Sequence, residues 1–251
     1  WSGKSMWLYD TGAAYEKSSV VQRVILPYLR AHNLLDITQG LIVSHGDWDH
    51  ASGLTELYTA LSPSYIWAGE PERLPDFGLM ERCKQGMVRE SEGMTFEVLY
   101  PFEFNNLKML SSNNHSCVIK VSVNSRSFLI MGDLEGDAEL ALVQKYKDKL
   151  KADVLIAGHH GSNNASSYTF LKYVKPDVVV FSAGYKNRFG HPHEDVRQRA
   201  GKFAKHIYNT ASNGAIVFSF NQSKDQEVEV TTTRNDKSPF WVLVDNYAAK
   251  N

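Results

Sequence analysis

The hydrophobic and polar positions of this chain form two kinds of pattern that alternate along it, one typical of strands and one typical of helices. Short apolar runs rich in β-branched residues are typical of strands, and they predict strands at residues 6–9, 41–43, 64–68, 94–100, 117–123, 127–131, 153–157, 176–181, 207–210, 214–220 and 227–233. Apolar residues that recur about every three or four positions predict helices at 18–32, 54–61, 137–150 and 194–203. Pro27 interrupts the first helix and predicts a kink or a break there. This rhythm indicates an α/β fold built in layers.

The segments between these elements lack either period. Residues 69–82 and 102–112 are predicted as loops, and 221–226 as a turn that links the last two strands. The sequence contains no linker and no low-complexity segment, so one domain over residues 1–251 is the simplest interpretation. The first strand begins almost at once, with no initiator methionine before it, and we expect a domain excised from a longer protein.

Composition narrows the classes of protein that this chain can belong to. Its 27 basic and 28 acidic residues nearly balance, so any contact with nucleic acid must come from a local patch. Its two cysteines, Cys83 and Cys117, do not form a disulfide framework, and their spacing does not show whether they pair. No window has the apolar length of a membrane-spanning helix, and no signal peptide is visible.

The densest candidate chemistry lies in the stretch LIVSHGDWDHASGL, residues 41–54. Directly after an apolar strand come four side chains of the kind that bind metals: His45, Asp47, Asp49 and His50. Without a cation, two carboxylates and two imidazoles in one tight loop would repel each other or shift their pKa values. The small residues around them let the backbone turn closely. The stretch predicts a metal-binding loop; the alternative is an acidic, solvated turn with incidental histidines.

More polar residues follow the other predicted strands. They lie in the segments DTG at 10–12, SSNNHS at 111–116, GDLE at 132–135, GHHGS at 158–162 and SAGYKNRFGHPH at 182–193. Because each follows a strand, one face of a layered sheet structure could gather them. The adjacent His159 and His160 would point to opposite faces of a continuing strand, so at most one is expected to ligate unless the chain turns there. Imidazoles and carboxylates without thiolates suit zinc or manganese.

HGDWDH resembles the HxHxDH signature of the metallo-β-lactamase superfamily, with Asp47 in place of the middle histidine. The HxDxDH variant is the pattern of the nuclease-like C-terminal domain of the ComEC family of DNA-uptake proteins. The NNHS, HHGS and NRFGHP segments also match that family's pattern, in order, so the resemblance covers nearly the whole chain. It implies a four-layer αββα sandwich.

The resemblance also implies two divalent metal ions, zinc or manganese, and no small organic cofactor. The expected ligands are His45, Asp47, Asp49, His50, His115, Asp133 and His159. Asp133 would bridge the two ions. His159 is preferred to His160 as the ligand, although the reverse order stays open. At the NNHS segment either His115 ligates, or Asn114 or Ser116 lines the site.

Catalytic roles are expected for Asp49, His160 and His191. His160 would orient a ligand or donate a proton, and His191 would protonate a leaving oxygen or bind metal. Asp10 would either orient the metal loop or cap a turn. A phosphodiester needs donors around its oxygens, and the residues expected to supply them are Ser162, Lys186, Asn187 and Arg188.

The function implied is a metal-dependent DNase that degrades the non-imported strand with a metal-activated hydroxide. Expected partners are single-stranded DNA and a channel domain of the same polypeptide. The parent protein would sit in the cytoplasmic membrane, with this domain on the periplasmic or extracytoplasmic side. Two alternatives stay open: another esterase of the superfamily, of phosphorylcholine esterase or lactonase type, and a non-catalytic DNA-binding domain with a degraded metal site.

Overall fold

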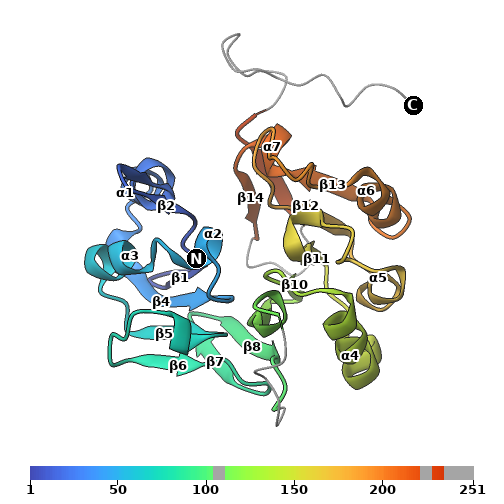
Figure 1. The fold of residues 1–251 in the computed structure, drawn as a ribbon, viewed down its shortest axis with the longest axis horizontal. Coiled ribbons are helices and arrows are strands. Elements are labelled where there is room, and N and C mark those ends of the chain that lie inside the picture. The colour runs from blue at the N-terminus through green and yellow to red at the C-terminus, as the bar shows by residue number, and fades with distance from the viewer. Residues whose placement is uncertain (104–110, 221–227, 235–251) are drawn as a thin grey trace.

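Two β-sheets lie face to face, and helices cover the outer surface of each sheet (Figure 1). The computed structural model describes residues 1–103, 111–220 and 228–234. The strands are β1 Met6–Tyr9, β2 Ala14–Tyr15, β3 Ser18–Ser19, β4 Thr38–Val43, β5 Tyr65–Ala68, β6 Met80–Arg82, β7 Val88–Ser91, β8 Met94–Tyr100, β9 Val118–Val123, β10 Arg126–Ile130, β11 Val154–Ile156, β12 Val178–Phe181, β13 His206–Asn209, β14 Ile216–Ser219 and β15 Glu229–Thr232. The α-helices are α1 Leu26–Ala31, α2 Trp48–Ala51, α3 Leu54–Leu61, α4 Gly136–Tyr146, α5 Tyr168–Val174, α6 Glu194–Gly201 and α7 Thr210–Asn213. Short 3-10 or π turns are η1 Val21–Ile25, η2 Leu35–Ile37, η3 Pro71–Arg73, η5 Asn113–His115, η6 Lys147–Leu150 and η7 Gly158–Gly161.

The first sheet has the strand order β1-β4-β5-β6, and all of its strands are parallel. The second has the order β13-β12-β11-β10-β9-β8-β7. It is parallel from β13 to β10 and antiparallel from β10 to β7. With α1 and α3 outside the first sheet and α4, α5 and α6 outside the second, the expected αββα sandwich is confirmed.

Alternation along the strands builds apolar layers on both faces of the sheets. In β4, Leu41 and Val43 pack toward α1 and α3, whereas Ile42 points between the sheets toward Trp67 and Ile119. The second sheet packs its other face against α4, α5 and α6. Complete burial of one such aliphatic side chain stabilises a fold by roughly 1.5–3 kcal/mol. The sheets are therefore held rigidly enough to position the loops at their ends.

Several predicted elements differ in detail. The helix expected at 18–32 is a short strand, then a π turn, then α1, and the change of helix type falls next to Pro27. The prediction of a loop at 69–82 was wrong, because this segment contains η3 and the edge strand β6. Strand β7 was not predicted. The turn expected at 221–226 and most of the 102–112 loop lie outside the described residues.

Cys83 and Cys117 form a disulfide bond with a Cα–Cα distance of 5.7 Å, which answers a question that their spacing left open. Cys83 follows β6 in the first sheet, and Cys117 precedes β9 in the second. The bond therefore ties the two sheets together. The backbone N–H of Cys117 also donates to the carbonyl of Ser44 at 2.8 Å, so the bond lies directly beside the loop that begins at His45.

Parallel strands bring their carboxyl ends to one edge of the sandwich. Asp10 follows β1 and His45 follows β4 in the first sheet. Asp133 follows β10 and His160 follows β11 in the second. The loops from the two sheets meet there, near α2 (Figure 1). Within the described residues, no helix has the length and apolar character needed to cross a membrane.

Candidate metal centre

The loop between β4 and α2 carries four of the predicted ligands. Asp47 is the N-cap of α2, and its carbonyl accepts the backbone N–H of His50 at 3.1 Å, which closes the first helical turn. This tight turn buries His45 and His50 and leaves Asp47 and Asp49 more exposed. The loop therefore presents its imidazoles inward and its carboxylates at the rim.

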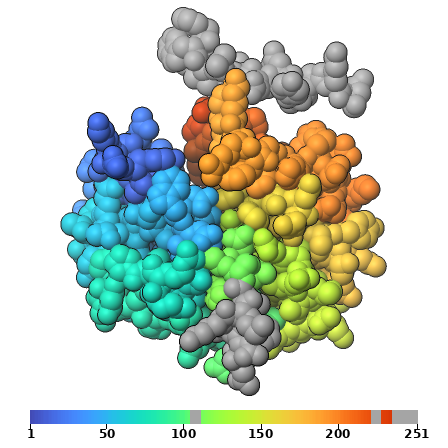
Figure 2. All heavy atoms as spheres, in the orientation of Figure 1, coloured from blue at the N-terminus to red at the C-terminus, as the bar shows by residue number. Residues whose placement is uncertain are grey.

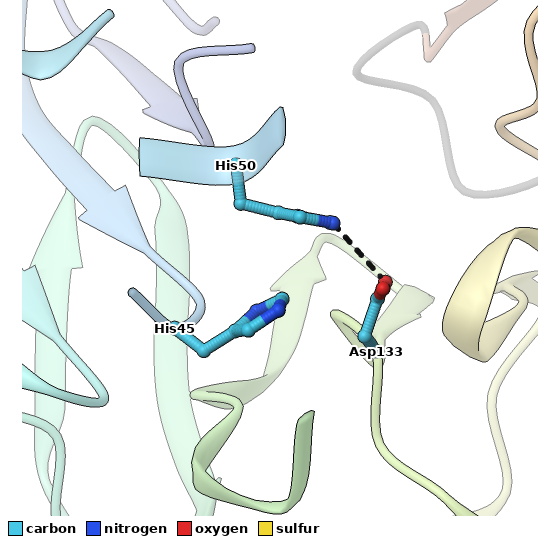
Figure 3. A group of neighbouring side chains, drawn as sticks. All are labelled: His45, His50 and Asp133. Atoms are coloured by element: carbon cyan, nitrogen blue, oxygen red, sulfur yellow. Dashed lines mark ion pairs between the residues drawn. The ribbon is translucent and has the colours of Figure 1, made fainter. Parts of the chain in front are cut away.

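His45, His50 and Asp133 form a buried group (Figure 3). One ligand-type atom from each lies within 4.8 Å of the others, and His50 Nε2 is 3.3 Å from Asp133 Oδ1. His45 Nε2 and Asp133 Oδ1 are buried with no hydrogen-bond partner in the part of the chain that the structure describes. A buried polar atom without a partner is costly and needs an explanation. A divalent cation fits this group, because it would satisfy both atoms.

A second group shares His50 with the first. It consists of Asp49, His50 and His160, again with ligand-type atoms within 4.8 Å of one another. His160 Nε2 lies 3.7 Å from Asp49 Oδ2 and 3.5 Å from Asp133 Oδ1. Asp133 thus adjoins both groups, where the resemblance expects a bridging carboxylate.

A cavity of about 400 Å³ opens onto these side chains, with Asp49, His50, Asp133 and His160 in its wall. The donor atoms facing it are imidazole nitrogens and carboxylate oxygens. Such a set suits zinc or manganese. The cavity gives a small substrate group direct access to the ligand atoms.

Charges in the cluster favour a bound cation. Burial lowers the pKa of His50, but Asp10 and Asp133 outweigh burial and raise that pKa to about 11. His160 lowers the pKa of Asp49 well below its ordinary value. Burial raises the pKa of Asp133, yet the neighbouring imidazoles, His50 foremost, bring it below its usual range. The carboxylates are therefore ionised at neutral pH, and in the metal-free protein protonated His50 is their counter-charge.

Asp10 orients the loop. Its carboxylate accepts His50 Nδ1–H at 2.7 Å, the Ser44 backbone N–H at 2.7 Å and the Ser44 hydroxyl at 3.0 Å. Because His50 Nδ1 is used in this way, its Nε2 is free to face the cluster. Asp10 has a left-handed backbone, with φ of 62°, an unusual conformation that positions its side chain under the loop.

Asp47 belongs to neither group of the described residues, although it adjoins His45. Its Oδ1 accepts from Arg73 at 2.9 Å, and its Oδ2 is 3.7 Å from His45 Nε2. Arg73 also bonds to the buried Glu70 at 3.0 Å, and Glu70 accepts the backbone N–H of Gly46 at 2.8 Å. Glu70 and Arg73 were missed in the sequence because they fall in the segment taken as a loop. The available signal was a carboxylate shortly after a buried strand.

His115 is also outside the two groups found among the described residues. Its Nδ1 donates to the Ser111 carbonyl at 2.9 Å and lies 3.5 Å from Glu70. The next residue, Ser116, accepts the backbone N–H of Asp133 through its hydroxyl at 2.9 Å. Gly132 makes this approach possible, because a Cβ there would lie 2.8 Å from the Ser116 hydroxyl oxygen. The NNHS segment thus supports the position of Asp133.

The positions of the two adjacent histidines favour His160 as the ligand, which is the order that the sequence left open beside the preferred His159. Both residues have a left-handed backbone, with φ of 48° and 53°, so the chain turns here and does not continue as a strand. His160 donates from Nδ1 to the Ser182 carbonyl at 2.7 Å and directs Nε2 into the ligand group. His159 instead lies between Asp133, at 3.9 Å, and Glu135, at 3.6 Å.

The predicted substrate-binding segment borders the cluster through His191, whose ring centroid is 5.7 Å from that of His159. Asn187 donates to the His191 carbonyl at 2.6 Å and accepts its N–H at 2.9 Å, so this amide shapes the loop. The Lys186 ammonium lies over the Tyr185 ring, and the Arg188 guanidinium lies over the Phe189 ring.

Two further predicted roles are affected by local contacts. Burial and the neighbouring His159, His193 and His160 lower the pKa of His191. The expected roles of His191, as proton donor or metal ligand, stay predictions. Ser162 is buried, and its backbone N–H donates to the His159 carbonyl at 2.8 Å. This contact assigns Ser162 a part in the histidine turn.

Comparison with known proteins adds relatives in sequence. Recombination protein 2 of Haemophilus influenzae is 32% identical over 249 residues, covering 97% of this chain and 29% of that protein. Competence protein ComA of Neisseria gonorrhoeae is 34% identical over 235 residues, covering 93% of this chain and 32% of that protein. The chain therefore spans about a third of the length of these relatives. No protein-family model matches it.

Comparison with solved structures agrees with the fold. The metallo-β-lactamase fold protein YhfI from Bacillus subtilis superposes with a TM-score of 0.50 at 13% identity, over 83% of this chain and 85% of that protein. The architecture and this match define a metallo-β-lactamase-fold domain. Within that class, the chain is homologous to the ComEC family of competence proteins and corresponds to its metallo-β-lactamase-like domain.

Proposed function

We propose that this chain is a metal-dependent phosphodiesterase that cleaves DNA and degrades the strand that is not imported during DNA uptake. The observation that carries the proposal is the pair of ligand groups that share His50 beside Asp133. The buried, unpartnered His45 Nε2 and Asp133 Oδ1 support a resident cation there. The cluster would hold two divalent ions, zinc or manganese, with His50 Nε2 as a ligand of one of them.

The ligand set would comprise His45, His50 and Asp133 in one group, with Asp49 and His160 completing the other. Divalent cations held by such ligands act as Lewis acids on phosphoryl oxygens and make water nucleophilic near neutral pH. The protein's own part is to hold these donors in place. Asp10 fixes the His50 ring, and the Ser182 carbonyl fixes the His160 ring.

Substrate binding falls to groups at the rim. A phosphodiester is held by cationic and hydrogen-bonding groups around its oxygens. Lys186 and Arg188 supply positive charge on the segment that reaches the cluster through His191. The names of the two relatives, a recombination protein and a competence protein, support nucleic acid as the substrate class.

The disulfide supports the proposed compartment. Disulfides persist in oxidising environments and are rare in the cytosol, so the Cys83–Cys117 bond favours the extracytoplasmic side of a membrane. The greater length of the relatives leaves room for a channel domain in the same polypeptide. We propose that the parent protein is a membrane protein and that residues 1–251 act as one domain of it.

The test is incubation of the pure chain with end-labelled single-stranded DNA and Mn²⁺ or Zn²⁺. We expect metal-dependent cleavage that chelation stops and that Asp49→Ala abolishes. Asp148→Ala is the matched control, because Asp148 is exposed and pairs only with Lys175 among the described residues. DNA binding without cleavage would instead support a non-catalytic domain, and hydrolysis of phosphorylcholine esters or lactones in place of DNA would support another esterase.

A further inference from the structure

Two exposed aromatic side chains stand beside the metal loop. Tyr15 is 63% exposed and Trp48 is 49% exposed. Their ring centroids are 4.6 Å apart and their planes meet edge to face at 80°. The indole N–H of Trp48 donates to the carbonyl of Ala14 at 2.9 Å, on the hairpin that carries Tyr15. The pair is thus held in one orientation while its rings face solvent.

The place of Trp48 in the sequence puts it next to the chemistry. It lies between Asp47 and Asp49, and consecutive Cα atoms are about 3.8 Å apart. Asp49 belongs to the ligand group with His50 and His160. Neither Tyr15 nor Trp48 belongs to an apolar core cluster of the described residues. The apolar cores therefore do not account for a large aromatic residue at this position, whose contacts are with the Ala14–Tyr15 strand.

A third exposed ring lies beyond the other end of the cluster. Contacts run from Asp49 to His160, and from His159 to His191, whose ring stacks on Phe189 with centroids 5.6 Å apart. Phe189 is 58% exposed and lies under the Arg188 guanidinium. The first half of the chain and the second half meet along one seam of the surface (Figure 2). Exposed aromatic side chains therefore lie on both sides of the candidate centre, and the one at Phe189 is accompanied by a cation.

We propose that Tyr15 and Trp48 form a nucleobase-stacking site that holds an unpaired base beside the scissile phosphate. Proteins that bind single strands combine aromatic platforms with cations along the backbone. Bases inside a duplex are stacked on each other and cannot reach such a platform, so the site selects single-stranded nucleic acid. The inference rests on the proposed function, because it assigns the substrate class of that same centre.

The experiment measures DNA binding by metal-free protein, so that cleavage does not interfere. Fluorescein-labelled single-stranded oligonucleotide and a duplex of the same sequence are titrated and followed by anisotropy. Tyr15→Ala and Trp48→Leu should each weaken single-strand binding at least about fivefold and leave the weaker duplex binding unchanged. Tyr168→Ala is the matched control, because Tyr168 is 57% exposed on the outer helix α5, and it should bind like the wild type.

A second readout covers the case in which Trp48→Leu fails to fold. Stacking of a base on the indole should quench the tryptophan fluorescence of the wild type, and the quenching should be lost in the conservative Trp48→Phe. Unchanged single-strand affinity in folded Tyr15→Ala, with no quenching in the wild type, would overturn the stacking site. Metal-dependent cleavage by the wild type with that result leaves the proposed function standing. If the variants weaken binding but the wild type shows no cleavage, the stacking site stands and the proposed nuclease function fails.

Discussion

At the scale of single residues, His50 connects the two sides of the candidate metal centre. Its Nδ1 is held by Asp10, and its Nε2 faces Asp133 and His160. The segments after β1 and β10 and the turn η7 therefore all contact this one imidazole. A change in the orientation of this ring disturbs both ligand groups, which gives Asp10 influence without direct contact with the metal.

Replacing Asp10 by Asn removes the charge and keeps the size of the side chain. We expect zinc or manganese affinity to fall about 10–100-fold, because a partner that orients a ligand imidazole typically contributes that much. Calorimetric titration of metal into the variant checks this. Asp148→Asn, at a distant exposed acid, should bind metal like the wild type, and an unchanged affinity in Asp10→Asn would contradict the orienting role.

Much of the candidate site could be predicted from the sequence because its residues crowd into short motifs. The HGDWDH and GDLE segments supply His45, His50 and Asp133, which the fold brings together. The choice between His159 and His160 could not be made, since it depends on a left-handed turn at both residues. Glu70 follows a buried strand, but its role was not recognised because it comes from contacts with residues distant in sequence.

At the scale of elements, the ends of β4 and β5 lie unusually close to the NNHS segment. A Cβ on Gly69 would lie 2.1 Å from the Ser44 carbonyl and 2.2 Å from the His115 carbonyl. Both neighbours are backbone atoms, so neither can move without shifting its segment. This contact packs the strand end of the metal loop against the turn that supports Asp133.

Gly69→Ala should therefore destabilise the fold by about 1–3 kcal/mol, as overpacking does in well-packed interiors. Urea unfolding followed by circular dichroism measures the change. Gly184→Ala is the control, since its nearest neighbour would be 3.8 Å away and its backbone is not left-handed. Equal unfolding midpoints for the two variants would show that the close approach is not rigid.

Strands and helices with a strong period were predicted well, as β8 and α3 show. The edge strands β6 and β7 were not predicted, because short edge strands carry few buried residues and so have a weak apolar pattern. Their pairing comes from the neighbouring strands β5 and β8. The helix expected at 137–150 consists of α4, which ends at Tyr146 where Lys147 turns left-handed, and the 3-10 turn η6 that follows it.

At the scale of the whole molecule, one disulfide bond cross-links the two halves of the sandwich. Cys83 and Cys117 are 34 positions apart in the sequence and belong to different sheets. The double variant Cys83→Ser with Cys117→Ser should lose about 2–4 kcal/mol of unfolding free energy, because the unfolded chain gains freedom. Urea titration with and without reductant tests this.

Reductant should lower the stability of the wild type to that of the double variant and leave the double variant unchanged. The bond lies beside Ser44 and next to Ser116, so metal affinity should also weaken in the reduced protein. A wild type whose unfolding midpoint does not respond to reductant would contradict a stabilising role for the bond.

Histidines and carboxylates from both sheets are expected to hold divalent metal jointly at the strand ends. Anomalous diffraction from crystals grown with Mn²⁺ or Zn²⁺ tests it most directly, because it locates the ions independently of activity. One peak is expected among His45, His50 and Asp133, and a second beside Asp49 and His160, with Asp133 between the two. Absence of any peak from this cluster in metal-saturated crystals would contradict it.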